Sequence, residues 1–275
     1  MPELHFFERA VRDRAARFLT SRVRTRRPLV EALTAIVERT AEAYLFGGLI
    51  RDLVITTGIV KPRDVDVVFS GADVDELISA IEGSVIRRTR FGGVSVNVCG
   101  WRLDLWPLEE TWAFRSRLVP TISFGTLPCT TFLNIEAVTL QIKSSPGCPR
   151  SIFECGFFDA VRSRTLELNL EENPFPALAV ARALVLASRM RYALGPRLVR
   201  YIAEYATTVS IEDVLRAQIQ HYGFVRRDRS DLERWLVAIR RHYETAAATA
   251  FELPVSNSVQ LTLWDTQNWD LLRYS

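Results

Sequence analysis

Apolar residues recur every three or four positions in two stretches near the N-terminus, which is the spacing that one face of an α-helix requires. A third stretch with the same pattern follows the glycine pair Gly47 and Gly48. The predicted helices cover residues 5–19, 29–42 and 49–56. Between the second and the third, the apolar run at 43–46 is too short for a helix and predicts a strand that leads into the glycines.

Four further segments combine β-branched and aromatic residues with flanking turn residues, which predicts strands. These segments are residues 65–69, 84–90, 94–99 and 102–106. Gly92 with Gly93, and then Gly100, supply the turns between the last three. A helical pattern at 73–81 separates the first strand from the second. Because strands and helices alternate here, we expect a mixed β-sheet with flanking helices.

From Pro174 onward there is no strand pattern, and helical periodicity takes over. The helices predicted in this part are residues 177–192, 197–205, 211–222 and 230–248. The predicted fold class is therefore α+β, with a mixed-sheet head domain at residues 1–165 and an all-helical neck and body domain at 166–275. Serine, proline and glycine at 144–149 favour a loop, either a hairpin turn or a disordered tip.

Composition is that of an ordinary globular protein. The 275 residues are 48% hydrophobic and 24% charged, which suits one large or two small domains with a sizeable core. No apolar run approaches the ~20 residues of a membrane helix, and no secretory signal pattern opens the sequence. We therefore expect a cytoplasmic protein without membrane contact. The four cysteines lack CxxC spacing and the three histidines are scattered, so we expect no zinc site.

The basic residues are more informative than the net charge of +3. All but two of the 35 are arginine, and Lys61 and Lys143 are the exceptions. Arginine clusters occur at residues 9–27, 87–90, 182–200 and 226–241. The planar guanidinium matches phosphate oxygens, so RNA contact is one interpretation. A solvated helix face is the other, and the sequence leaves both open.

The main chemical signal is an ordered pair of motifs. Gly47 and Gly48 have no Cβ, so their N–H groups can approach a phosphate at the positive N-terminal end of the following helix. Arg51, one turn later, can add a charged fork. Asp64 and Asp66 then lie two residues apart on a predicted strand, so both carboxylates point to one face and can hold divalent cations. The pair predicts a triphosphate cradle beside a metal site; a tight turn with a helix-surface arginine is the alternative.

These motifs resemble the head domain of the polymerase-β-like nucleotidyltransferases, in the branch that contains bacterial poly(A) polymerases and CCA-adding tRNA nucleotidyltransferases. That branch carries Gly-Gly-x-Val-Arg-Asp, a short loop and Asp-x-Asp. The segment from Gly47 to Asp52 departs from it only at Ile50, which replaces valine. The resemblance implies transfer of NMP from an NTP to an acceptor hydroxyl, with two Mg²⁺ or Mn²⁺ ions as cofactors. It also implies that Asp52 belongs to the nucleotide-binding segment.

The resemblance further implies a third catalytic carboxylate on a neighbouring strand. Asp104 is the candidate, since it alternates with apolar Leu103 and Leu105 on a predicted strand. The alternative is an exposed strand residue. By this resemblance Asp64 and Asp66 hold the metal at the triphosphate, and all three acids hold the metal that activates the acceptor hydroxyl.

Two later family elements are altered in this chain. Asn134 matches the asparagine of the family's Arg-Asp-Phe-Thr-x-Asn-Ala element, whereas the Arg-Asp pair is missing. The family reads the base with Glu-Asp-x-x-Arg, and in this chain those positions are Phe175, Pro176 and Ala179. The usual base-reading side chains are therefore absent. The arginines that remain on this predicted helix, Arg182 and Arg189, are candidates for triphosphate or RNA contact, and structural salt bridges explain them equally well.

Three functions remain open from the sequence. The first is an enzyme that adds NMP to an RNA 3′ end, such as that of a tRNA. The second transfers NMP to a protein or a small molecule, as toxin-type and antibiotic-modifying members of the superfamily do. The third is a catalytically silent nucleotide-binding module, against which the three carboxylates argue. The sequence does not indicate an oligomeric state. For the aromatic segment at 251–275, the simplest expectation is that it packs against the helical body.

Overall fold

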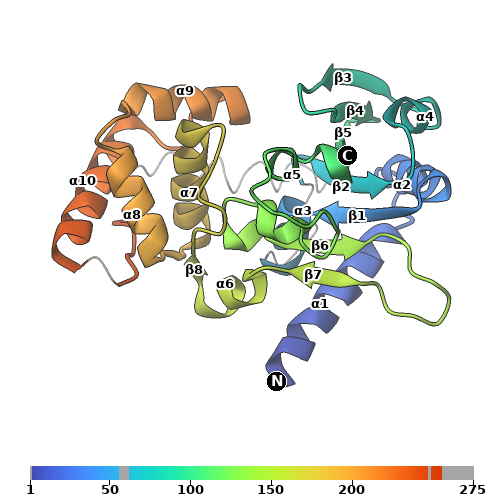
Figure 1. Cartoon of the computed structure of the whole chain (residues 1–275), viewed down its shortest axis with the longest axis horizontal. Helices are drawn as coiled ribbons and strands as arrows, with labels where there is room; N and C mark the ends of the chain where they lie inside the picture. The colour runs from blue at the N-terminus through green and yellow to red at the C-terminus, as the bar shows by residue number, and fades with distance from the viewer. Residues whose placement is uncertain (1, 56–61, 247–248, 256–275) are drawn as a thin grey trace. The chain divides into compact units, whose positions relative to one another are not determined.

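The computed structural model describes residues 2–55, 62–246 and 249–255, including the backbone of helix α1 from its start (Figure 1). The chain divides into two compact units. The first unit consists of Met1–Thr131 and Ile135–Phe158, and the second of Phe132–Asn134 and Asp159–Ser275. The second unit thus takes a short segment from within the sequence of the first.

A seven-stranded mixed sheet forms the centre of the first unit, as the alternation of strands and helices predicts. Its strands are β1 (Glu42–Phe46), β2 (Val65–Ser70), β3 (Ser84–Arg88), β4 (Val94–Val98), β5 (Trp101–Pro107), β6 (Val138–Gln141) and β7 (Ile152–Glu154). Their order across the sheet is β3-β4-β5-β2-β1-β6-β7. The β2–β5 pair is parallel and the other pairs are antiparallel. No strand pattern predicted β6 or β7, which form a hairpin around the loop expected at 144–149.

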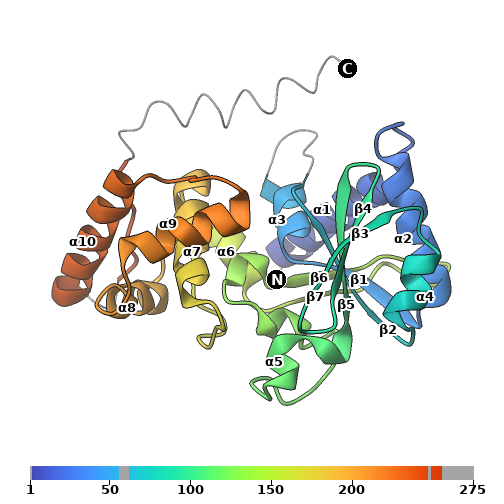
Figure 2. The same cartoon turned by 90° about the horizontal axis from the view of Figure 1, so that it is seen from above.

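Helices cover one face of this sheet. They are α1 (Pro2–Leu19), α2 (Arg27–Arg39), α3 (Gly48–Ile55) and α4 (Val74–Ser79), close to the predicted ranges. Figure 2 shows α1, α2 and α3 on one side of the strands and α5 (Trp112–Arg115) on the other. Leu45, Val67 and Leu103 are fully buried in the strands, as alternation of side chains toward the helices requires. This apolar layer is the principal core of the unit.

The opposite face of the sheet carries a second, mostly aromatic cluster. Tyr44 and Val68 pack there with Phe114 and Phe124, and the Tyr44 and Phe124 rings stack with centroids 4.3 Å apart. Short 3₁₀ helices complete this side: η1 (Leu108–Glu110), η2 (Leu127–Thr130) and η3 (Asn134–Glu136). Burial raises the pKa of Tyr44 to about 12, with a further contribution from the charge of Glu42. The hydroxyl is therefore a neutral part of the core at ordinary pH.

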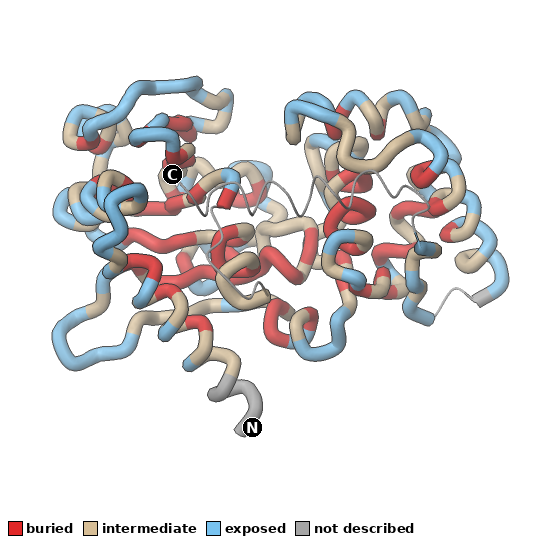
Figure 3. Tube along the Cα trace, turned by 180° about the vertical axis from the view of Figure 1, so that it is seen from behind, coloured by how far each residue is buried: buried red, intermediate tan, exposed pale blue. Residues whose placement is uncertain are grey.

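The second unit is built mainly from helices, as predicted. They are α7 (Pro176–Met190), α8 (Pro196–Tyr205), α9 (Ile211–Tyr222) and α10 (Arg229–Ala246), with α6 (Phe157–Ser163) at the unit boundary. The expectation of no strand after Pro174 is wrong at one place. A parallel pair joins β8 (Thr165–Leu166) to β9 (Ala193–Leu194), and two residues are too few to produce a detectable alternation. Figure 3 marks the buried segments of each unit in red.

One side chain of the second unit closes the turn between α9 and α10. Gln218 is fully buried. Its Oε1 accepts from the backbone N–H groups of Arg226 and Arg227, at 2.9 and 2.8 Å, and its Nε2 donates to the carbonyl of Arg227 at 3.0 Å. These bonds satisfy a turn that has no regular secondary structure of its own. Among the described residues, no helix is both long and apolar enough to cross a membrane.

Replacing Gln218 with alanine should destabilise the second unit. The change removes the hydrogen bonds of Gln218 to partly buried backbone groups of the turn, at a cost of about 2 kcal/mol in the free energy of unfolding. Urea titration followed by circular dichroism measures this cost. Gln220→Ala is the matched control, because Gln220 lies on the same helix and is exposed. Equal stability of the two variants would contradict the role assigned to Gln218.

Candidate active site

The predicted glycine turn joins β1 to α3. Gly47 has φ +65°, a left-handed conformation that costs a side-chain-bearing residue roughly 1–2 kcal/mol. Its N–H donates to the carbonyl of Val138, and its own carbonyl accepts from the N–H groups of Ile50 and Arg51, which begins the helix. The first turn of α3 contains no acidic residue. The N–H groups of Gly48 and Leu49, at the first two positions of α3, have no acceptor within the helix, so they form a positive end next to the turn.

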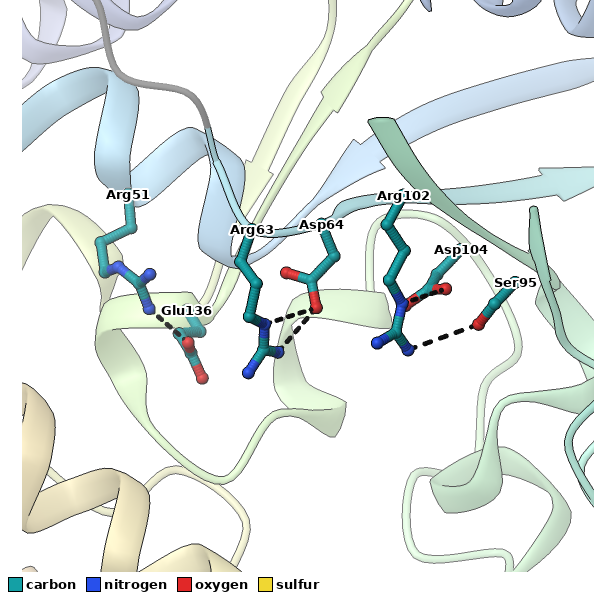
Figure 4. A network of polar contacts seen from close by, with 7 residues as sticks. All are labelled: Arg51, Arg63, Asp64, Ser95, Arg102, Asp104 and Glu136. Carbon is teal, nitrogen blue, oxygen red and sulfur yellow. Dashed lines mark hydrogen bonds and ion pairs between the residues drawn. The ribbon is translucent and has the colours of Figure 1, made fainter. Parts of the chain in front are cut away.

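Arg51, predicted to reach a triphosphate, lies buried at 8% exposure. Its Nε donates to Asp52 Oδ1 at 2.9 Å, and its Nη1 donates to Glu136 Oε1 (Figure 4). Glu136 comes from η3, and it is also buried. The guanidinium therefore ties α3 to the segment that leads into β6. A nucleotide contact by Arg51 or Asp52 stays a prediction.

Two of the three predicted catalytic acids lie on neighbouring strands of the sheet, and the third directly precedes one of these strands. Asp66 on β2 and Asp104 on β5 are direct partners in the parallel register, so both side chains point to the same face. Asp64 lies two residues before Asp66, immediately ahead of β2. On the other side of β2, Asp66 pairs with Phe46, the last residue before the glycine turn. The register thus brings the turn and the acids to adjacent positions in one sheet.

Two arginines are paired with these acids. Arg63 Nη2 lies 2.6 Å from Asp64 Oδ2, and Arg102 Nε lies 3.2 Å from Asp104 Oδ1 (Figure 4). Arg102 Nη2 also donates to Ser95 Oγ at 3.4 Å. The pKa of Arg102 is raised: burial lowers it, but the hydrogen bond to Asp104 and the negative charges of Asp104, Asp64 and Asp66 outweigh burial. All three acids therefore act on a single guanidinium.

The acids do not gather around a common centre while these ion pairs are in place. Among the described residues, no three Asp, Glu, His or Cys side chains are close enough together to hold a metal ion. Asp64 and Asp104 each face an arginine instead. The donor chemistry nevertheless suits Mg²⁺ or Mn²⁺, because all three groups are carboxylates.

The other predicted nucleotide-binding residues belong to the second unit. The side-chain oxygen of Asn134 accepts from the N–H of Glu167 at 2.9 Å, and its amide nitrogen donates to the carbonyl of Thr165 at 3.4 Å. Asn134 therefore fastens its segment to β8. Arg182 is half-buried and Arg189 is exposed, both on α7. For all three, contact with nucleotide or RNA stays a prediction.

Three residues of the site, Arg102, Ser95 and Glu136, were not predicted from the sequence, and only the first has a local signal. Arg102 precedes Asp104 by two positions on a strand, so strand periodicity alone points both to one face. Ser95 is the direct register partner of Asp104 on β4 and is buried, which becomes visible only once the strands are paired. Glu136 lies 85 residues from Arg51, and no local pattern links the two.

Comparison with known proteins places the fold. No family model matches the sequence, and no curated protein matches it. The structure is similar to that of a tRNA-processing enzyme in its apo form, with TM-score 0.53 and 16% identity over 90% of this chain and 64% of that one. A complex of a tRNA-processing enzyme gives TM-score 0.54 and 16% identity over 89% and 65%. Each of these two structures is longer, so this chain spans less than two thirds of its length.

A third similar structure is a tRNA nucleotidyltransferase complexed with a primer tRNA and an incoming ATP analogue. It gives TM-score 0.50 and 16% identity, over 85% of this chain and 67% of that one. The chain has the fold of these enzymes. The predicted fold class, a nucleotidyltransferase head with a mixed sheet followed by a helical body, is confirmed. At this identity the likeness concerns the fold, and activity rests on the residues of the site.

Glu136→Ala should destabilise the first unit because it removes a buried charge partner of Arg51. We expect a loss of about 3 kcal/mol in the free energy of unfolding, measured by urea titration. Glu110→Ala is the control, since its ion pair with Arg115 is exposed and contributes less than about 1 kcal/mol. A loss for Glu136→Ala no larger than for the control would refute the clamp between α3 and η3.

Proposed function

We propose that this protein is a metal-dependent nucleotidyltransferase that moves NMP from an NTP to the 3′ hydroxyl of an RNA and releases pyrophosphate. One observation carries the proposal. Phe46, Asp66 and Asp104 are consecutive register partners on β1, β2 and β5, and adjacent strands are about 4.8 Å apart. A turn with free helix N–H groups therefore adjoins a pair of carboxylates, which is the arrangement that a triphosphate with bound cations requires.

Asp64, Asp66 and Asp104 are the residues that would hold two divalent cations, Mg²⁺ or Mn²⁺. Such ions, when bound, supply positive charge to the phosphates and acidify an acceptor hydroxyl. The chain itself contributes the N–H groups of Gly48 and Leu49 to the phosphate oxygens, and Gly47, whose own N–H is bonded to Val138, supplies the turn that presents them. Arg51 and Asp52, with Glu136, keep the start of α3 in position for that contact. Asn134, Arg182 and Arg189 are proposed to contact nucleotide or RNA from the second unit.

An RNA acceptor is supported by the row of side chains that continues from the acids to the edge of the sheet. Arg87 on β3 is the register partner of Ser95, which in turn pairs with Asp104. Arg87 is exposed and has no ion pair with any described residue, whereas its neighbour Arg88 pairs with Asp75. A free guanidinium in line with the acids can bind a phosphate of an incoming strand.

Arg90 strengthens this interpretation of the edge. Its guanidinium lies 4.6 Å from the ring centroid of Phe91, at the β3–β4 turn. Cationic and aromatic groups side by side suit the alternating phosphates and bases of a single strand. A protein or a small-molecule acceptor does not present this alternation of phosphates and bases. We therefore place RNA ahead of the other acceptors.

The activity can be tested by incubating the purified protein with Mg²⁺ and one labelled NTP at a time. Each reaction contains either total RNA or total protein as the acceptor. Label should enter the RNA. Label in protein or in a small molecule would overturn the choice of acceptor, and no label in any fraction would overturn the activity.

Asp66→Asn should reduce transfer by several orders of magnitude. The protein should stay folded, because the substitution removes one of the like charges at the site. Asp13→Asn, an exposed change on α1, is the control and should retain transfer.

Arg87→Ala tests the path of the acceptor. We expect a higher KM for RNA, an unchanged KM for NTP, and a slope of binding against salt that is smaller by about one ion. Arg9→Ala, which removes an exposed arginine of α1, should leave all three quantities unchanged. An equal effect of the two variants would show that Arg87 contributes only general positive charge.

A further inference from the structure

Arg102 occupies an unusual position for a positively charged residue in a cation-binding site. Its side chain is 32% exposed, and that of its partner Asp104 is 7% exposed. It holds Asp104 with Nε and Ser95 with Nη2. Both partners point to the face on which the acids lie, as the register with β4 and β5 requires. The guanidinium therefore lies on the face of the sheet that carries Asp66 and Asp104.

The acids need such a charge when no cation is bound. Asp66 and Asp104 are side by side on adjacent strands, and like charges at that separation repel each other strongly where water is excluded. Arg63 neutralises Asp64 from a more exposed position, at 41%. For buried Asp104, Arg102 is the ion-pair partner in the structure. The apo site is thus stabilised by a charge that the chain itself supplies.

We propose that Arg102 is a built-in counterion that competes with the divalent cation for Asp104. Asp104 cannot give its oxygens fully to the guanidinium and to a metal ion at the same time. Binding of the cation therefore requires Arg102 to release Asp104, which weakens metal affinity in the absence of substrate. The proposal rests on the proposed function only for the identity of the ligand as a divalent cation.

Once released from Asp104, Arg102 can contact the triphosphate. A freed guanidinium beside a bound triphosphate has new oxygen acceptors, to which its planar fork is well matched. NTP then compensates for the broken Arg102–Asp104 pair, so NTP and metal each strengthen the binding of the other. This coupling would keep the acids from holding a cation tightly until a nucleotide is present.

Mn²⁺ titration of the full chain without nucleotide or RNA tests the proposal. Arg102→Gln should bind Mn²⁺ roughly tenfold more tightly than the wild type, because a positive charge is removed and Asp104 is released. The same variant should melt at a lower temperature in EDTA, where the acids lose their counterion. Structural damage alone would weaken Mn²⁺ binding, so the direction of the change separates the two explanations.

Two further variants keep the test sound if Arg102→Gln folds poorly. Ser95→Ala removes only the second anchor of Arg102 and should tighten Mn²⁺ binding by a smaller factor. Arg115→Gln breaks an exposed ion pair on α5 and should leave the affinity unchanged. Unchanged or weaker Mn²⁺ binding in both Arg102→Gln and Ser95→Ala would overturn the proposal.

The coupling to nucleotide is measured by repeating the titration with a non-hydrolysable ATP analogue. The analogue should tighten Mn²⁺ binding more in the wild type than in Arg102→Gln, and an equal effect would overturn the contact between Arg102 and the triphosphate. None of these measurements involves transfer. A protein that shows the expected Mn²⁺ behaviour without transfer activity would overturn the proposed function alone.

Discussion

Asp66 and Asp104 lie side by side on the only parallel strand pair of the seven-stranded sheet in the described chain, and their like charges are a constraint that the neighbouring side chains must offset. Register partners on adjacent strands have their side chains on the same face of the sheet. Asp66 and Asp104 therefore stay close together as long as both strands remain paired. Two arginines supply positive charge to the three acids: Arg63 pairs with Asp64, and Arg102 pairs with Asp104. Any ligand of this site must replace that charge or add to it.

The glycine turn depends on a separate buried contact. Arg51 and Glu136 form a buried ion pair, and Asp52 accepts a further hydrogen bond from Arg51 Nε. A buried pair of this kind adds little net stability, but it is costly to break on one side only. Its value here is positional, because it fixes the start of α3 against the segment that precedes β6. The contact therefore helps to hold the N–H groups of the turn in a fixed orientation.

Local sequence was sufficient for the elements that have a periodic pattern or a glycine signal. The helices α7 to α10 and the strands β1, β2, β4 and β5 lie within a few residues of their predicted bounds. β6 and β7 were missed because they have four and three residues and follow a stretch of irregular turns, where alternation cannot be recognised.

The residues of the candidate site also fall into those that a local motif predicts and those that it does not. The acids and glycines could be found because each lies in a short motif, and Asp104 because of strand alternation. Glu136 could not be found, since its partner Arg51 is brought to it by the pairing of β1 with β6. Arg102 was overlooked for a different reason. An arginine is not one of the residue types sought as a metal ligand, although its spacing of two residues from Asp104 was visible in the sequence.

The connection between the two units has a consequence for how the chain can be divided. The segment Phe132–Asn134 belongs to the second unit, and the backbone before and after it belongs to the first. Leu133 forms a β-bridge with Leu168, and Asn169 donates its N–H to the carbonyl of Phe132. A fragment that begins at Asp159 would lack these partners, and one that ends at Phe158 would carry them with nothing to bind. The units are thus interleaved in sequence, and neither can be obtained whole as a single continuous piece.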